Sequence, residues 1–149
     1  MTSSLRERAL RLLARREHAR AELARKLSAH SESAEELEAL LNDLSARGLL
    51  SDERYVEMRM NARGARYGNA RLAYDLRTQG VSDELVDSAL GTCNDEISRA
   101  HEVLLRKFGE KYTTHDVTER ARQTRFLISR GFSGETIRRV LRGDFEEDQ

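Results

Sequence analysis

The sequence has no proline, no tryptophan and only one cysteine, and its aromatic residues are four tyrosines and four phenylalanines. What it has instead is charge, since 35% of the residues are charged, together with many Leu, Ala, Arg and Glu residues that favour helix over sheet. The hydrophobic content of 38% is sufficient for one folded chain of 149 residues with a modest core. We therefore predict an all-α fold.

The sequence lacks the residues that several functional classes require. A single cysteine, Cys93, excludes an internal disulfide and a cysteine-based metal cluster, and we expect it to be an ordinary, partly buried thiol. The four histidines are far apart and none forms a metal-ligating pair such as HExxH, and no GxSxG or Gly-Lys-Ser/Thr motif occurs. We expect a protein without catalytic centre, metal or cofactor.

Long apolar runs are also missing. The first thirty residues carry arginines throughout, so neither a transmembrane segment nor a signal peptide fits. We expect a soluble, cytoplasmic protein with no membrane partner.

The zero formal net charge of the chain conceals an alternating pattern. Three basic segments are each followed by an acidic one, with net charges of +5 (1–30), −6 (31–57), +4 (58–80), −5 (81–97), +6 (98–142) and −4 (143–149). Solvated helices carry many charges in any protein, but three blocks in register also fit a molecule with separate positive and negative surfaces. The acidic tail, 144–149, is either a solvated terminus or a cover for a basic surface.

Helix signals recur along the whole chain. Leu37, Leu40, Leu41 and Leu44 follow the i, i+3, i+4, i+7 spacing, after a capping box that begins at Ser33. The same rules predict nine helices, near 4–15, 19–29, 33–47, 52–63, 69–79, 83–90, 95–108, 115–130 and 134–142.

An internal repeat organises these helices. The segment 80–90 aligns with 131–141, and 48–53 is a looser copy with one extra residue before its serine. In each copy a glycine ends one helix, an apolar residue folds back, and a serine caps the next helix. We predict three tandem three-helix, helix-turn-helix-like repeats, 4–50, 51–91 and 94–143, that stack into an elongated array, straight or curved.

Arginines on helices are the candidate binding residues. Arg59, Arg63 and Arg66 share a narrow arc if their helix extends to 66, and further arginines follow in the third repeat. Guanidinium groups suit phosphate or carboxylate partners, and Tyr67 could stack on a base or pack over Gly68. The predicted partner-binding or DNA-binding set is Arg59, Arg63, Arg66, Tyr67, Arg71, Arg77, Arg120, Arg122, Arg125 and Arg130.

Four stretches resemble one bacterial family. They are REHARAEL with Lys26-Leu27 (16–27), GLLSDERYV (48–56), YGNARL with the following Asp75-Leu76 and Gln79-Gly80-Val81 (67–81), and RFLISRGF (125–132). Their order and spacing are similar to the RecX family of regulators of the RecA recombinase, over nearly the whole chain from about Leu5 to Leu141. One departure is Ala19, which stands where the family has a helix-capping serine and should weaken that cap by about 1 kcal/mol.

The resemblance implies a function that the residues alone do not. It implies three three-helix repeats that bind the RecA–DNA filament, block its extension or promote its disassembly, and so inhibit strand exchange, ATP hydrolysis and co-protease activity in homologous recombination and DNA repair. It also implies secondary contacts with single- or double-stranded DNA, and we expect a monomer. The alternative is a stand-alone helix-turn-helix DNA-binding protein such as a transcription regulator, which should dimerise on a two-fold site.

Overall fold

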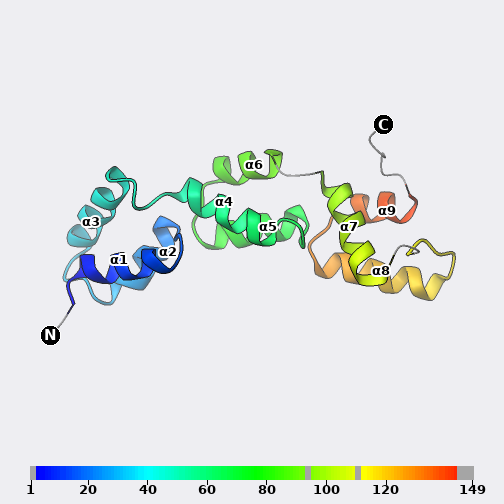
Figure 1. Cartoon of the computed structure of the whole chain (residues 1–149), viewed down its shortest axis with the longest axis horizontal. Helices are drawn as coiled ribbons and strands as arrows, with labels where there is room; N and C mark the ends of the chain where they lie inside the picture. The colour runs from blue at the N-terminus through cyan, green and yellow to red at the C-terminus, as the bar shows by residue number, and fades with distance from the viewer. Residues whose placement is uncertain (1–2, 93–94, 110–111, 144–149) are drawn as a thin grey trace. The chain divides into compact units, whose positions relative to one another are not determined.

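The computed structural model describes residues 3–92, 95–109 and 112–143, and within them it contains nine α-helices and no strand (Figure 1). The predicted Cys93 thiol and the acidic tail lie outside the described residues. The nine helices agree with the predicted ranges, so the all-α prediction is confirmed. They are α1 (Leu5–Arg15), α2 (Arg20–Ser28), α3 (Ala34–Ala46), α4 (Asp52–Arg63), α5 (Asn69–Thr78), α6 (Asp83–Thr92), α7 (Glu96–Phe108), α8 (Val117–Ser129) and α9 (Gly134–Leu141).

The repeated sequence motif has one structure in all three copies. The glycines at 48, 80 and 131 have φ values of 74°, 83° and 85°. Each is followed by an amide that reaches back to a leucine carbonyl of the preceding helix, from Leu49 to Leu44, from Val81 to Leu76 and from Phe132 to Leu127. The serine hydroxyl that comes next accepts a hydrogen bond from a backbone amide of the following helix at 3.1–3.2 Å. Tandem helical repeats are therefore present.

The looser first copy accommodates its extra residue on the surface. Leu49 is 44% exposed, whereas Leu50 is buried, as are Val81 and Phe132 in the other two copies. Because the amides of Leu49 and Leu50 both contact the Leu44 carbonyl, at 2.9 and 3.2 Å, the additional residue widens the turn without changing which side chain enters the core.

The chain forms two compact units, and the helices of the middle repeat divide between them. Unit 1 contains residues 1–58 and 76–87, and unit 2 contains 59–75 and 88–149. In unit 1, α2 packs against α1 and α3, and buried leucines of all three helices form its core. In unit 2, α9 packs against α7 and α8, around buried side chains that include Leu104, Leu127 and Val140. The predicted repeat boundaries stay a prediction.

The start of α2 has an acceptor from elsewhere in unit 1. Ala19 has no side chain that could cap the helix, but Asp52 Oδ1 accepts a hydrogen bond from the Arg20 amide at 2.7 Å. Glu22 Oε1 accepts a longer one from the Ala19 amide, at 3.3 Å. The carboxylate at the start of α4 thus takes part of the role that the family's serine would have.

A glycine-to-helix contact recurs in both units. In unit 1, a Cβ added at Gly80 would lie 2.4 Å from Ala21 Cβ, in the first turn of α2. In unit 2, a Cβ added at Gly131 would lie 2.4 Å from Arg71 Cβ and 2.8 Å from Arg71 N, in the first turn of α5. The glycine that ends the second helix of one predicted repeat therefore packs on the second helix of the repeat before it.

A buried polar group in unit 1 joins the start of α2 to its middle. His18 is 2% exposed, with Nδ1 3.1 Å from the Arg16 carbonyl and Nε2 3.0 Å from Lys26 Nζ. A neutral imidazole satisfies both contacts, since Nδ1–H donates and Nε2 accepts. Burial lowers the pKa of His18, and the charges of Arg16 and Lys26 act in the same direction. Burial raises the pKa of neighbouring Glu22, but the hydrogen bonds of 2.6 and 3.0 Å from Arg16, together with the positive charges of Arg16 and Lys26, leave that pKa below its ordinary value.

Gly131→Ala should destabilise the protein more than Gly48→Ala. Both replacements place a Cβ on a backbone with positive φ, which costs about 1–2 kcal/mol. Only the Cβ at 131 also meets backbone atoms, whereas the space around Gly48 is open within 4 Å. The extra crowding should cost a further 1–3 kcal/mol or so. Urea unfolding followed by circular dichroism measures both, and equal losses would mean that the contact with α5 contributes nothing.

The free energy of unfolding should fall as the pH decreases through and below 6.5. His18 has its ordinary pKa of 6.5 in the unfolded chain, whereas its pKa in the folded protein is lower. The unfolded state then binds the extra proton. Unfolding measured between neutral pH and pH about 5, above the range in which most carboxylates titrate, should show this slope. His18→Gln should remove it, whereas the exposed His115→Gln should leave it unchanged. The same slope in both variants would assign it to other groups.

Candidate functional site

Tyr67 in unit 2 is surrounded by three guanidinium groups. The Cζ atoms of Arg63, Arg71 and Arg130 lie 5.8, 5.2 and 5.3 Å from the centre of its ring, within the range of cation–π interactions. We call these four residues and Asp75 the Tyr67 cluster. Four of its five members belong to the middle repeat, and Arg130 comes from the end of α8, so sequence positions 63 and 130 meet around one ring.

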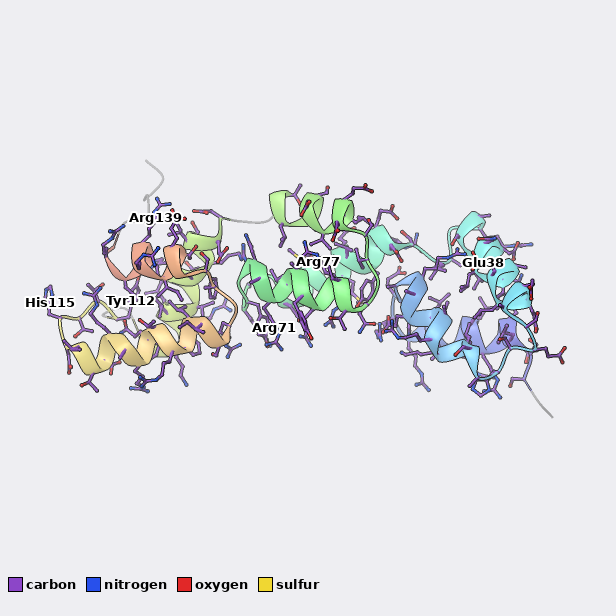
Figure 2. The ribbon with its side chains drawn as sticks, turned by 180° about the vertical axis from the view of Figure 1, so that it is seen from behind. Glu38, Arg71, Arg77, Tyr112, His115 and Arg139 are labelled. Atoms are coloured by element: carbon purple, nitrogen blue, oxygen red, sulfur yellow. The ribbon has the colours of Figure 1, made fainter. Side chains whose placement is uncertain are left out.

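One carboxylate partly neutralises the cluster. Asp75 Oδ2 lies 3.3 Å from Arg63 Nη1 and 3.4 Å from Arg71 Nε. Figure 2 labels Arg71 on α5, one turn before Asp75. Arg130 has no ion pair within the described part of the chain. The cluster therefore keeps two net positive charges and several guanidinium donors for a partner.

Two sets of contacts to the backbone around residue 67 hold Tyr67 in this place. The Arg99 side chain, 5% exposed, donates from Nε to the Gly64 carbonyl at 3.1 Å and from Nη2 to the Tyr67 carbonyl at 3.0 Å. It also donates to Asn69 Oδ1 at 2.8 Å. In addition, the Gly68 amide donates to the Arg130 carbonyl at 2.8 Å, and a Cβ at Gly68 would lie 2.3 Å from the Gly131 carbonyl oxygen. The loop 64–68 is fixed to α7 and to the end of α8.

A cationic groove of about 390 Å³ adjoins the cluster. Its lining includes Arg66, Arg106, Lys107 and Arg130, with Phe126 as the aromatic wall. The Arg130 guanidinium lies 5.2 Å from the Phe126 ring centre as well as 5.3 Å from Tyr67, so one cation bridges two rings. Lys107 Nζ lies 5.9 Å from the Phe126 ring, which in turn meets Phe108 edge to face at 5.6 Å. We call this feature the Arg130 groove.

The structure brings together only part of the predicted set. Arg63, Tyr67, Arg71 and Arg130 form the Tyr67 cluster, and Arg66 lines the Arg130 groove. Since α4 ends at Arg63, Arg66 lies on the following turn, so the helical arc that would have joined it to Arg59 and Arg63 does not form.

The other predicted arginines lie elsewhere. Arg77 belongs to unit 1, on the same helix as Arg71 in Figure 2, and pairs with Asp83 at 2.9 Å. Arg122 stacks on Phe108 at 5.2 Å and pairs with Glu119. Arg59 and Arg120 are half-buried and Arg125 is exposed; none of these three has an ion pair among the described residues.

Sequence reasoning missed three cations that the geometry places at the site. Arg106 and Lys107 form a basic pair in the last turn of α7, a position typical of helix ends and therefore without a distinctive signal. Arg99 lies between Ile97 and Ala100 in the sequence, and both of these apolar residues are buried. Its apolar neighbours were the signal in the sequence that Arg99 is buried. Nothing in the sequence indicates which carbonyl groups accept its hydrogen bonds.

The predicted absence of a metal site can be compared with the described side chains. Among them no group of three or more His, Cys, Asp or Glu side chains could hold a metal ion. Tyr112 is buried beside His101, with 2.7 Å between Oη and Nδ1, and Figure 2 shows it inside the α7–α8 connection while His115 lies at the outer edge. Burial raises the pKa of Tyr112 to about 12, which keeps the phenol protonated at neutral pH. No described helix has both the length and the apolar character to cross a bilayer.

Comparison with known proteins gives one consistent result. Sequence models of the second and third three-helix domains of RecX match residues 51–90 and 94–141. The Regulatory protein RecX of Leptothrix cholodnii is 47% identical over 147 residues, which cover 97% of this chain and 92% of that protein. The Regulatory protein RecX of Herminiimonas arsenicoxydans is 41% identical over 146 residues, covering 97% and 95%.

A solved structure extends the likeness to the fold. The crystal structure of RecX from Lactobacillus salivarius superimposes with a TM-score of 0.78 at 20% identity, over 93% of each chain. Two family models match most of the chain, and the relatives named above are more than 40% identical over almost its full length. The chain therefore belongs to the RecX family of regulatory proteins.

Proposed function

We propose that the protein is a non-enzymatic negative regulator that binds the RecA–DNA filament, and that the Tyr67 cluster with the Arg130 groove is its main contact. The observation that carries this proposal is the convergence of Arg63, Arg71 and Arg130 on one partly exposed tyrosine, next to a groove with further unpaired cations. Membership of the RecX family supports the choice of RecA as the partner.

The chemistry of this surface fits an anionic partner. Each guanidinium is a planar fork of donors that matches a carboxylate or a phosphate, and stacking on Tyr67 and Phe126 fixes the plane of that fork. Arg66, Arg106 and Lys107 add charge at the rim without a carboxylate partner in the described residues. Acidic surfaces of RecA protomers and, secondarily, phosphates of the enclosed DNA both present such groups.

Binding at several points would suffice for inhibition. A repeat protein that contacts more than one protomer gains affinity by avidity without a deep pocket. A bound chain would then block the addition of protomers or favour their release, and strand exchange, ATP hydrolysis and co-protease activity would decrease together. In this proposal the regulator acts as a monomer in the cytoplasm.

The direct test is RecA-catalysed strand exchange and DNA-stimulated ATP hydrolysis with the protein added below the RecA concentration. Both activities should decrease. If neither decreases and the protein instead binds one duplex sequence tightly as a dimer, it is a transcription regulator and the proposal is wrong.

Arg66→Gln/Arg130→Gln should weaken inhibition by roughly a hundredfold in concentration, because two charge-assisted contacts of about 1.5 kcal/mol each are lost. The matched control is Arg138→Gln/Arg139→Gln, which removes two charges from α9, away from the Tyr67 cluster and the Arg130 groove, and should inhibit like the parent protein. Inhibition curves in the ATPase assay make the comparison. Equal curves for both double variants would place the contact on another surface.

A further inference from the structure

The arginines of unit 1 fall into two groups. Six of them form ion pairs: Arg6 and Arg47 with Asp43, Arg16 with Glu22, Arg20 with Glu38, Arg54 with Glu17 and Arg77 with Asp83. Arg8, Arg11 and Arg15 of α1 have no ion pair within the residues that the structure describes. Arg25 of α2, the tenth arginine of the unit, donates a hydrogen bond to the neutral side chain of Gln79. Three of the four arginines without an ion pair are thus on one helix.

These three arginines line a groove between α1 and the end of α2. The groove has a volume of about 340 Å³, and Lys26 and His30 line it from the α2 side. Leu12 and Leu27 are the apolar part of its lining, and no carboxylate belongs to it. We call it the α1–α2 groove. Among the described residues, Glu22 is the carboxylate that forms an ion pair with a residue of this lining: its Oε2 is 3.8 Å from Lys26 Nζ and only 2.6 Å from Arg16 Nη2.

This arrangement works against the folding of α1. Arg8 and Arg11 are spaced i, i+3 and Arg11 and Arg15 are spaced i, i+4, so like charges are neighbours along one side of the helix. The six ion-paired arginines of the unit show that carboxylates can neutralise such charges elsewhere in this unit. A row of cations that opposes stability is explained by a ligand that neutralises the whole row.

We propose that the α1–α2 groove binds the phosphate backbone of DNA. From Arg8 to Arg15 the helix rises about 10 Å, a length that matches about three phosphates of one strand at 3.4 Å each along a duplex axis. Regularly spaced charges of this kind fit a polyanion better than the scattered carboxylates of an acidic protein surface, and Leu12 offers an apolar contact for the sugars. The choice of DNA rests on the proposed function, while the groove itself is separate from the Tyr67 cluster.

The test uses the whole protein and labelled oligothymidylate, without RecA, and measures fluorescence anisotropy over a range of salt concentrations. Arg8→Gln/Arg11→Gln/Arg15→Gln should lower the affinity and reduce the slope of log affinity against log salt by about 2, since each phosphate contact on a single strand contributes about 0.7. A labelled duplex in a parallel titration shows whether double-stranded DNA behaves in the same way, with a loss of about 0.9 per contact.

The matched control is Arg6→Gln/Arg47→Gln/Arg54→Gln, which removes three charges from the same unit at positions that already have carboxylate partners. Its salt slope should equal that of the parent protein. If both triple variants have the same lowered slope, the change in salt dependence comes from net charge alone and the proposal is wrong. Competition by polyglutamate as effective as by unlabelled oligothymidylate, at equal charge, would also overturn it and identify an acidic protein as the ligand.

Two measurements keep the result interpretable. Circular dichroism and urea unfolding should show the groove variant at least as stable as the parent, because a repulsion is removed. If the triple variant does not fold, the single substitution Arg11→Gln, at an exposed position, should still reduce the slope by about 0.7. An unchanged slope would contradict the proposal. Because RecA is absent, loss of DNA binding here and loss of filament inhibition in the Tyr67 cluster are separate outcomes.

Discussion

The close approach of two backbones at Gly68 and Gly131 is the constraint on which the candidate site depends. No Cβ fits at either position, and the hydrogen bond from the Gly68 amide to the Arg130 carbonyl fixes their register. Tyr67 and Arg130 directly precede these two glycines in the chain, and they are brought side by side as a consequence. The site is therefore not built by its arginines, which would repel one another, but by an uncharged contact next to them.

The same kind of contact explains how the predicted repeats join. Gly80 packs on α2 and Gly131 packs on α5, in each case near the first turn of the second helix of the preceding repeat. A positive φ is needed at this glycine to end its own helix, and the missing side chain is needed for the neighbour to approach. One residue thus performs both tasks. This also gives a physical reason why α5 divides between the two compact units, since its start contacts Gly131 and its end leads into Gly80.

Much of the fold could be predicted from the sequence because its signals are local. Leucine periodicity, serine caps and the recurring Gly-apolar-Ser pattern depend on residues within one or two turns, and the structure shows them at the expected places. The site was predictable only in part. That Arg63 and Arg130 share a tyrosine depends on a contact between positions 68 and 131, and the buried role of Arg99 depends on carbonyl groups thirty or more residues away. Charge alone could not separate Arg77, which pairs with Asp83 in unit 1, from Arg71, which lies over the Tyr67 ring.

The division between paired and unpaired cations is more informative than the number of cations. Most arginines of unit 1 have a carboxylate partner, and these pairs lie largely on its surface, where each stabilises the fold by little. Their effect is to remove positive charge from most of the unit. The folding requirements are met by a small set of glycines, buried leucines and caps, which is consistent with a shared fold at 20% identity. The Arg130 groove and the row along α1 each gather several cations without a carboxylate partner in the described residues, so a chain of zero formal net charge keeps concentrated positive charge at both places.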